Sequence, residues 1–315
     1  MKLKKLTLPI ALILLATLQI SGCATETATG TEESVNVRVV VTRDFGQQIL
    51  LDQELDIPTG SPAMTALEQV AEVETSHGGG FVTAINGLGS ENSLDWFIYF
   101  NGMQSNIGAL DYTMRDGDVQ IWDYHDWSYR MFTPAVIGYY PEPFLHGYSG
   151  KLRPAVIVYE DEYYEEANSL RDTLLNLGAS DVSIVATRDL SDSAQKSANL
   201  ILIGTIDSNE LLSELNGAWD RLGFFVHCEG NKILLYDSEG GTTSECSSGC
   251  GVIQATQNPW NPKGTGVCEN VAWMISGTDD AGVRSAVDIL INHYDIVEHA
   301  FAVVVANSSV IKVPQ

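Results

Sequence analysis

Four cysteines are the residues of this chain whose type and spacing most directly suggest chemistry. Cys228, Cys246, Cys250 and Cys268 lie within 41 residues of one another. Such a set forms two disulfides in an oxidising compartment, binds zinc through four thiolates, or remains as free thiols. The Cys-x3-Cys spacing at 246–250 is tolerable for zinc, but the flanking gaps of 17 residues do not form paired short knuckles. The compartment therefore decides which chemistry to expect.

The first 23 residues predict that compartment. Basic residues at 2, 4 and 5 precede an apolar run, Leu6–Leu18, of signal-peptide length. Ile20-Ser21-Gly22-Cys23 then resembles the lipobox of prokaryotic lipoproteins. The resemblance implies cleavage after residue 22 and a lipid on Cys23, so the protein is anchored to the membrane from outside the cytoplasm. The alternative is an ordinary cleaved signal peptide with an incidental cysteine. Outside the cytoplasm, the other four cysteines are predicted to form two disulfides of unspecified pairing, and no metal site is predicted.

Charge excludes one class of partner. The chain has 17 basic and 41 acidic residues, a net charge of −24, and the loss of three signal-peptide lysines leaves a net charge of −27. Phosphate contacts need Lys and Arg, so nucleic acid is not an expected partner. Residues 24–34 are small and polar, so we expect 23–34 to form a flexible tether.

The pattern of residues 35–129 predicts a small sheet with one helix on it. Val35–Val41 and Gln48–Leu55 are expected to form a hairpin, and further strands are expected at 81–85, 96–100 and 119–124. A helix is expected from Pro62 to Glu72, with Ser61 as its N-cap. Asn-Gly and Asp-Gly-Asp sequences supply the turns. This is an α+β pattern of the β-grasp kind.

The rest of the chain predicts a connector and a second domain. Residues 130–153 combine prolines with aromatic residues, and we expect this connector to pack against a domain. In residues 154–315, apolar strands alternate with helices, with strands at 155–159, 182–186, 200–203 and 271–276 and helices at 163–177, 209–215 and 281–293. A hairpin is expected around residues 229–231. This alternation predicts a parallel sheet in an α/β, Rossmann-like three-layer domain.

One stretch of the first domain resembles a known family. Its residues are Leu94-Asp95-Trp96-Phe97-Ile98-Tyr99-Phe100-Asn101-Gly102, then Ala109-Leu110-Asp111-Tyr112, then Arg115-Asp116-Gly117-Asp118-Val119-Gln120-Ile121-Trp122. In this order they resemble the transcobalamin-like C-terminal domain family, over residues of about 60–125. The resemblance implies ligand binding at the cell surface, with a corrinoid as the possible ligand.

The aromatic residues on the motif strands are the candidate ligand contacts. Alternation places Trp96, Ile98 and Phe100 on one face of a strand, and Phe97 and Tyr99 on the other. One face must be core, and the opposite face could stack on a flat ligand or on a partner protein. The predicted ligand-binding residues are Trp96, Tyr99, Asn101, Trp122 and Tyr124.

Three further sequence patterns give weaker indications of function. The turns after residues 203 and 276 lack a G-x-G-x-x-G or P-loop pattern, and Asp279 and Asp280 are better suited to capping a helix than to binding phosphate. Residues 199–209 and 277–290 weakly resemble S-layer-type surface proteins. The acidic run from Glu160 to Glu166 follows a predicted strand and is interpreted as a solvated helix start, although a carboxylate pair of a carbohydrate-active enzyme is conceivable.

These observations predict a lipid-anchored, extracytoplasmic protein that binds a small-molecule ligand or an envelope protein, without catalysis and without a required cofactor. A structural or adhesion protein of the cell envelope is the alternative from another class.

Overall fold

The computed structural model describes residues 33–306 and 309–315. The predicted signal peptide, the lipid-attachment residue Cys23 and most of the predicted tether lie outside this part of the chain. Residues 33–315 cluster as one compact unit. It is a mixed α+β, strand-rich structure, with several sheets and few helices. Within the described ranges, no helix is both long and apolar enough to cross a membrane.

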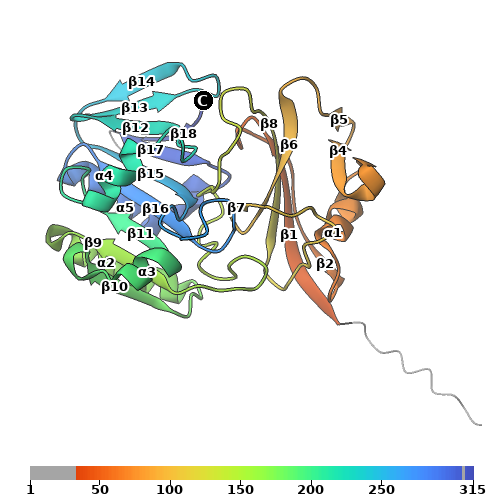
Figure 1. Cartoon of the computed structure of the whole chain (residues 1–315), viewed down its shortest axis with the longest axis horizontal. Helices are drawn as coiled ribbons and strands as arrows, with labels where there is room; N and C mark the ends of the chain where they lie inside the picture. The colour runs from red at the N-terminus through yellow and green to blue at the C-terminus, as the bar shows by residue number, and fades with distance from the viewer. Residues whose placement is uncertain (1–32, 307–308) are drawn as a thin grey trace, which may run out of the picture. The chain divides into compact units, whose positions relative to one another are not determined.

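The first sheet has five strands, and its hairpin was predicted. β1 (Ser34–Arg43) and β2 (Gln48–Pro58) pair antiparallel, as the alternating sequence indicated, and β8 (Val119–Asp126) lies parallel to β1 on its other side (Figure 1). The strand order is β2 (Gln48–Pro58), β1 (Ser34–Arg43), β8 (Val119–Asp126), β6 (Leu94–Phe100), β7 (Met103–Gln104).

One helix and a small sheet complete this half. The helix is α1 (Ala63–Val70), and the small sheet is formed by β3 (Val73–Ser76), β4 (Phe81–Ile85) and β5 (Leu88–Gly89). The predicted cap was wrong, because Pro62 itself is the N-cap residue and Ser61 lies outside the helix. Asn101 and Gly102 both have positive φ, at 49° and 77°, as an Asn-Gly hairpin turn requires.

The second sheet has seven strands and is mixed. The order is β10 (Val182–Ala186), β9 (Ala155–Tyr159), β11 (Asn199–Ile203), β16 (Val271–Gly277), β15 (Cys250–Gln257), β17 (Ala302–Ala306), β18 (Ser309–Val313). The first four strands are parallel, as predicted. The prediction of a parallel sheet was incomplete, because β15, β17 and β18 add antiparallel pairs, and no crossover helix connects β15 to β16.

Both faces of the second sheet are covered. One face packs on α2 (Tyr164–Asn176) and α5 (Asp280–Asn292), and the other on α4 (Glu210–Gly217) and a hairpin sheet. The hairpin sheet is formed by β12 (Val226–Glu229), β13 (Lys232–Tyr236) and β14 (Thr242–Cys246), with the predicted turn after Glu229. A short helix, α3 (Asp192–Ser197), precedes β11. The remaining elements are 3-10 turns at His77–Gly79, Asp161–Tyr163, Thr187–Asp189 and Tyr294–Val297.

The two large sheets are packed against each other. Tyr99 of β6 contacts Phe301 with ring centroids 5.7 Å apart, and Phe45 contacts both Phe225 and Phe301. The connector also packs, as predicted, since Tyr140 and Phe144 lie against Trp273 of β16. We call the side chains between the sheets, Phe45, Tyr99, His125, Phe225 and Phe301, the inter-sheet seam.

Candidate functional site

The five predicted ligand-binding residues are all buried. The predicted alternation is correct, since Trp96 and Phe100 belong to the core under α1 while Phe97 and Tyr99 face the inter-sheet seam. The expectation of a free face was wrong, because the second sheet covers it. Exposed fractions are 7% for Trp96, 0% for Tyr99, 4% for Trp122 and 3% for Tyr124, so no ring of this set is available for stacking on a ligand in the described conformation.

Asn101, the fifth candidate, has a structural role. Its amide Nδ2 donates to Asp118 and to the carbonyl of Gly147, and its Oδ1 accepts from the Val119 backbone N–H. The Asn101 side chain is fully buried. Burial raises the pKa of the Asp118 carboxyl, and the hydrogen bond from Asn101 opposes that shift. The motif that carries the family resemblance therefore holds turns together in this chain.

Exposed apolar side chains gather instead on two neighbouring loops, which we call the loop surface: residues 77–81 and 107–110. Phe81, Leu110 and Ile107 are 48%, 42% and 37% exposed. The loops are in contact, because a Cβ built on Gly79 would lie 3.5 Å from Leu110 Cδ1 and one on Gly108 would lie 3.1 Å from the Gly80 carbonyl oxygen. The sequence indicated a turn at Gly78-Gly79-Gly80 next to the apolar Phe81. It did not indicate that residues 107–110 lie beside this turn, because that contact depends on the fold.

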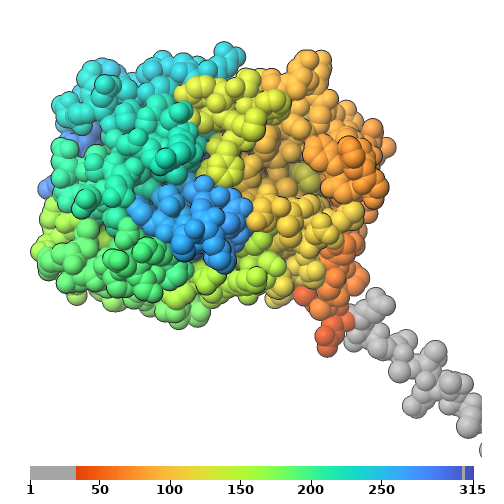
Figure 2. Space-filling view, in the orientation of Figure 1, coloured from red at the N-terminus to blue at the C-terminus, as the bar shows by residue number. Residues whose placement is uncertain are grey.

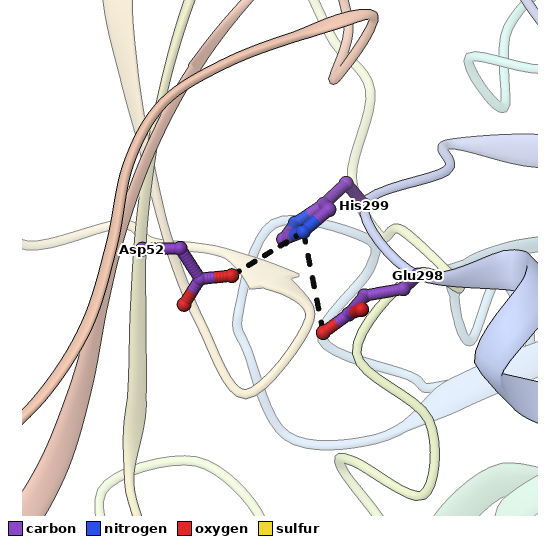
Figure 3. Close-up of side chains that lie close together, drawn as sticks. All are labelled: Asp52, Glu298 and His299. Carbon is purple, nitrogen blue, oxygen red and sulfur yellow. Dashed lines mark ion pairs between the residues drawn. The ribbon is translucent and has the colours of Figure 1, made fainter.

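A second cluster joins the two sheets by charge (Figure 3). Asp52 on β2 and Glu298 and His299 before β17 offer ligand atoms within 4.8 Å of one another, the kind of set that can hold a metal ion. Arg38 supplies the positive charge between these carboxylates, because its Nη2 donates to Asp52 Oδ2 at 2.6 Å and to Glu298 Oε1 at 2.5 Å. The guanidinium bridges both carboxylates, so the cluster has its own cation. We therefore interpret it as an ion-pair network between the sheets.

His299 in this cluster is held by close packing. A Cβ on Gly46 would lie 2.0 Å from the His299 carbonyl oxygen, and one on Gly138 would lie 2.6 Å from its amide nitrogen. The imidazole Nε2 lies 3.3 Å from Asp52 Oδ2. Burial lowers the pKa of His299, while the nearby carboxylates oppose that shift.

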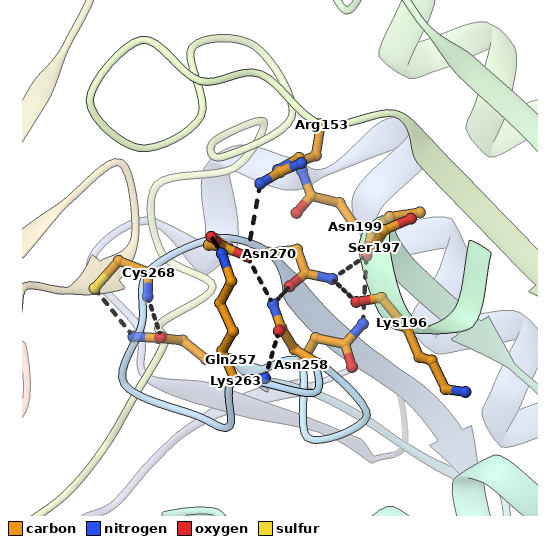
Figure 4. Close-up of polar contacts among 12 residues, drawn as sticks. Arg153, Lys196, Ser197, Asn199, Gln257, Asn258, Lys263, Cys268 and Asn270 are labelled. Atoms are coloured by element: carbon orange, nitrogen blue, oxygen red, sulfur yellow. Dashed lines mark hydrogen bonds and ion pairs between the residues drawn. The ribbon is translucent and has the colours of Figure 1, made fainter. Parts of the chain in front are cut away.

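The cysteines form one of the two expected disulfides. Cys246 and Cys250 are bonded, whereas Cys228 and Cys268 are separate, buried free thiols. The expectation that all four pair was wrong because these two lie in different packing environments. Cys228 is in the core under α4, and burial raises its pKa to about 12. Cys268 donates through Sγ to the Gln104 carbonyl at 3.1 Å and lies beside Gln257 (Figure 4).

The acidic run after β9 is a helix start with local partners. Asp161 is paired with Arg188, Glu166 with Arg284, and Tyr163 donates its hydroxyl to Asp280 at 2.9 Å. Asp279 caps α5 as predicted, since its carboxylate accepts from the Gly282 and Gly249 amides. These contacts give Asp161, Glu166 and Asp279 local structural partners.

Comparison with known proteins matches a minor part of the chain. Residues 60–126 match a family described as "Domain of unknown function (DUF4430)", nearly the same residues as those carrying the transcobalamin-like motifs. No curated protein matches significantly. Haptocorrin in complex with Cbi aligns at 18% identity over 30% of this chain and 26% of its own, with a TM-score of 0.26. A Ruminococcus gnavus protein provisionally described as metal binding aligns at 21% identity over 29% of this chain and 97% of its own, with a TM-score of 0.24. The chain thus spans about a quarter of the length of haptocorrin, and its function must be argued from its own residues.

Proposed function

We propose that this chain is a membrane-anchored, extracytoplasmic binding protein that captures a flat macrocyclic ligand, stacked on apolar side chains, without transforming it. The observation that carries the proposal is the loop surface, where Phe81, Ile107 and Leu110 are exposed together. An exposed apolar group of this kind costs solvation free energy unless something covers it, and it is typical of binding sites. The lipobox sequence ending at Cys23 supports the location.

The loop surface has the chemistry that a flat ligand needs. Phe81 supplies an aromatic face, and His77 lies beside it with ring centroids 6.4 Å apart. Gly78 and Gly79 have φ of 73° and 93°, so the adjacent backbone has no side chains that would keep a ligand away. The transcobalamin-like motifs make a corrinoid the named candidate. We further infer that residues 35–129 are a β-grasp-like unit and that residues 154–315 are a Rossmann-like unit.

The experiment is a titration of the full chain with cobalamin and with cobinamide, followed by calorimetry and by visible spectra. We expect saturable binding of at least one of them. Phe81→Ala should weaken it by roughly 1–3 kcal/mol, the usual effect of removing an aromatic binding residue. Met131→Ala is the matched control, because Met131 is a large apolar side chain, 66% exposed, outside the loop surface.

Two results would overturn the proposal. Absence of heat and of a spectral shift at about 100 times a micromolar dissociation constant would exclude a corrinoid ligand of useful affinity. Equal weakening by Phe81→Ala and Met131→Ala would show that the loop surface is not the site.

A further inference from the structure

A second binding site is suggested by a cleft in the other half of the molecule. The cleft has a volume of about 440 Å³ and lies between the end of α4 and the loop after β15. Figure 2 shows that loop in blue beside the teal surface of α4. Cavities of 300–1,000 Å³ are typical of small-molecule sites. The side chains and backbone that line it are those of Glu214, Leu215, Gly217, Ala218, Arg221, Leu222, Pro259 and Trp260.

One wall of the cleft is an indole held in place. Trp260 donates through Nε1 to Glu214 Oε2 at 2.7 Å, and its backbone N–H donates to Asn258 Oδ1 at 2.8 Å. The loop is itself anchored, because Asn258 Nδ2 donates to the Gln195 carbonyl. Asn270 Nδ2 donates to the Lys196 carbonyl (Figure 4). A ring fixed in this way loses little conformational entropy when a ligand stacks on it.

The second feature is an arginine without a partner. Seven of the nine arginines have a carboxylate within 4.0 Å, namely Arg38, Arg43, Arg130, Arg153, Arg171, Arg188 and Arg284. Arg115 donates to the Thr113 carbonyl. Arg221 lines the cleft and has no hydrogen bond or ion pair with any residue that the structure describes. In a chain with a net charge of −24, an unpaired guanidinium beside a cleft favours an anionic ligand.

We propose that this cleft binds an acidic saccharide, with a pyranose ring against Trp260 and a carboxylate on Arg221. The guanidinium matches a carboxylate in charge and in bidentate geometry. Glu214 also lines the cleft, and it would repel a simple anion but accepts hydrogen bonds from sugar hydroxyls. A uronate carries both hydroxyl donors and a carboxylate, so it satisfies both groups at once. The site is separate from the loop surface, and it goes beyond the function proposed above.

The test is calorimetric titration of the full chain with the trisaccharide of galacturonic acid, with its methyl ester as the neutral comparator. We expect saturable binding of the acid and at least tenfold weaker binding of the ester. Arg221→Gln should weaken binding of the acid at least tenfold. Arg188→Gln is the matched control, because Arg188 lies outside the cleft, with a side chain 66% exposed.

A blocking variant separates binding from folding. A Cβ on Gly217 meets no atom within 4 Å, so Gly217→Leu places a side chain into the cleft without a clash at its first atom. We expect this variant to unfold at the wild-type temperature and to lose binding. No saturable binding of the acid, equal binding of acid and ester, or full binding by a folded Gly217→Leu variant would each overturn the proposal.

Discussion

His125 and Asp123 form a hydrogen bond of 2.6 Å between Nδ1 and Oδ2, and both side chains are shielded from solvent by the inter-sheet seam. The imidazole is stacked between Phe45 and Phe97, with ring centroids 4.1 Å away on each side. Asp123 also accepts hydrogen bonds from the amides of Phe45 and Gly46. One carboxylate therefore fixes both the imidazole and the turn after β1.

The first prediction concerns that carboxylate. Asp123→Ala leaves the Phe45 and Gly46 amides and the His125 ring without their acceptor in a dry environment, so we expect a loss of roughly 3–5 kcal/mol in the free energy of unfolding. Urea denaturation measures it. Asp192→Ala, at a side chain 93% exposed, is the control and should change stability by less than about 0.5 kcal/mol. A similar small effect at Asp123 would contradict the structural role.

The second prediction concerns close packing around His299. Gly138→Ala would place a Cβ 2.2 Å from the Ala300 amide nitrogen, so the backbone must move. We expect a cost of about 1–3 kcal/mol or more in the free energy of unfolding. Gly217→Ala is the matched control, because its Cβ meets nothing within 4 Å. Equal stability of the two variants in thermal denaturation would show that the packing of His299 is looser than described.

The third prediction concerns pH. Burial lowers the pKa of His299 below its ordinary value of 6.5. As the pH falls through 6.5, the unfolded state takes up this proton more readily than the folded state, so the free energy of unfolding decreases. His146 has the opposite sign, because its hydrogen bond to Glu142 raises its pKa. The stability that His146 contributes is present below pH 6.5 and is lost as the pH rises through its raised folded value.

Two variants separate these contributions. The measurement is urea unfolding at pH 5.5 and at pH 7.5. We expect His299→Asn to reduce the loss of stability on acidification, and His146→Asn to increase that loss. Asn tolerates the φ of 63° found at His299. His293→Asn, at a side chain 55% exposed, serves as the control. The same pH dependence in all three variants would contradict the assignment.

Local sequence patterns predicted the strands and helices of this fold, but they did not predict which side chains pack against them. The period of two on β6 correctly separated Trp96 from Tyr99, because the pleat of a strand is a local property. The burial of the Tyr99 face of β6 was not predictable, because Phe301, which covers Tyr99, is about 200 residues away in the sequence. The pairing of Arg38 with Glu298 likewise joins residues 260 positions apart, and neither residue carries a local signal of it. The candidate site is at Phe81 rather than at the predicted residues, because packing between distant parts of the chain buries the predicted residues.

The cysteines give a fourth prediction. Non-reducing peptide mapping should show Cys246 bonded to Cys250, with Cys228 and Cys268 free. Both free thiols should react with a maleimide only after denaturation, because they are 8% and 3% exposed and burial raises the pKa of each. Replacing Cys246 and Cys250 by Ser should cost about 2 kcal/mol, since the closed loop is short. A Cys228–Cys268 disulfide in the folded protein would contradict the structure.

The last prediction concerns the anchor, which lies outside the described residues and rests on the lipobox sequence. Cys23 is the proposed lipid-attachment residue, so cells that express the wild-type chain should incorporate labelled fatty acid into it, and the protein should fractionate with membranes. Cys23→Ser should abolish the label and release the protein, because a chain with a net charge of −24 has no attraction for anionic lipid. Cys228→Ser is the matched control, and it should retain the label. Membrane association of Cys23→Ser together with an unlabelled wild type would instead indicate another means of attachment, and it would remove the basis for placing the binding site at the cell surface.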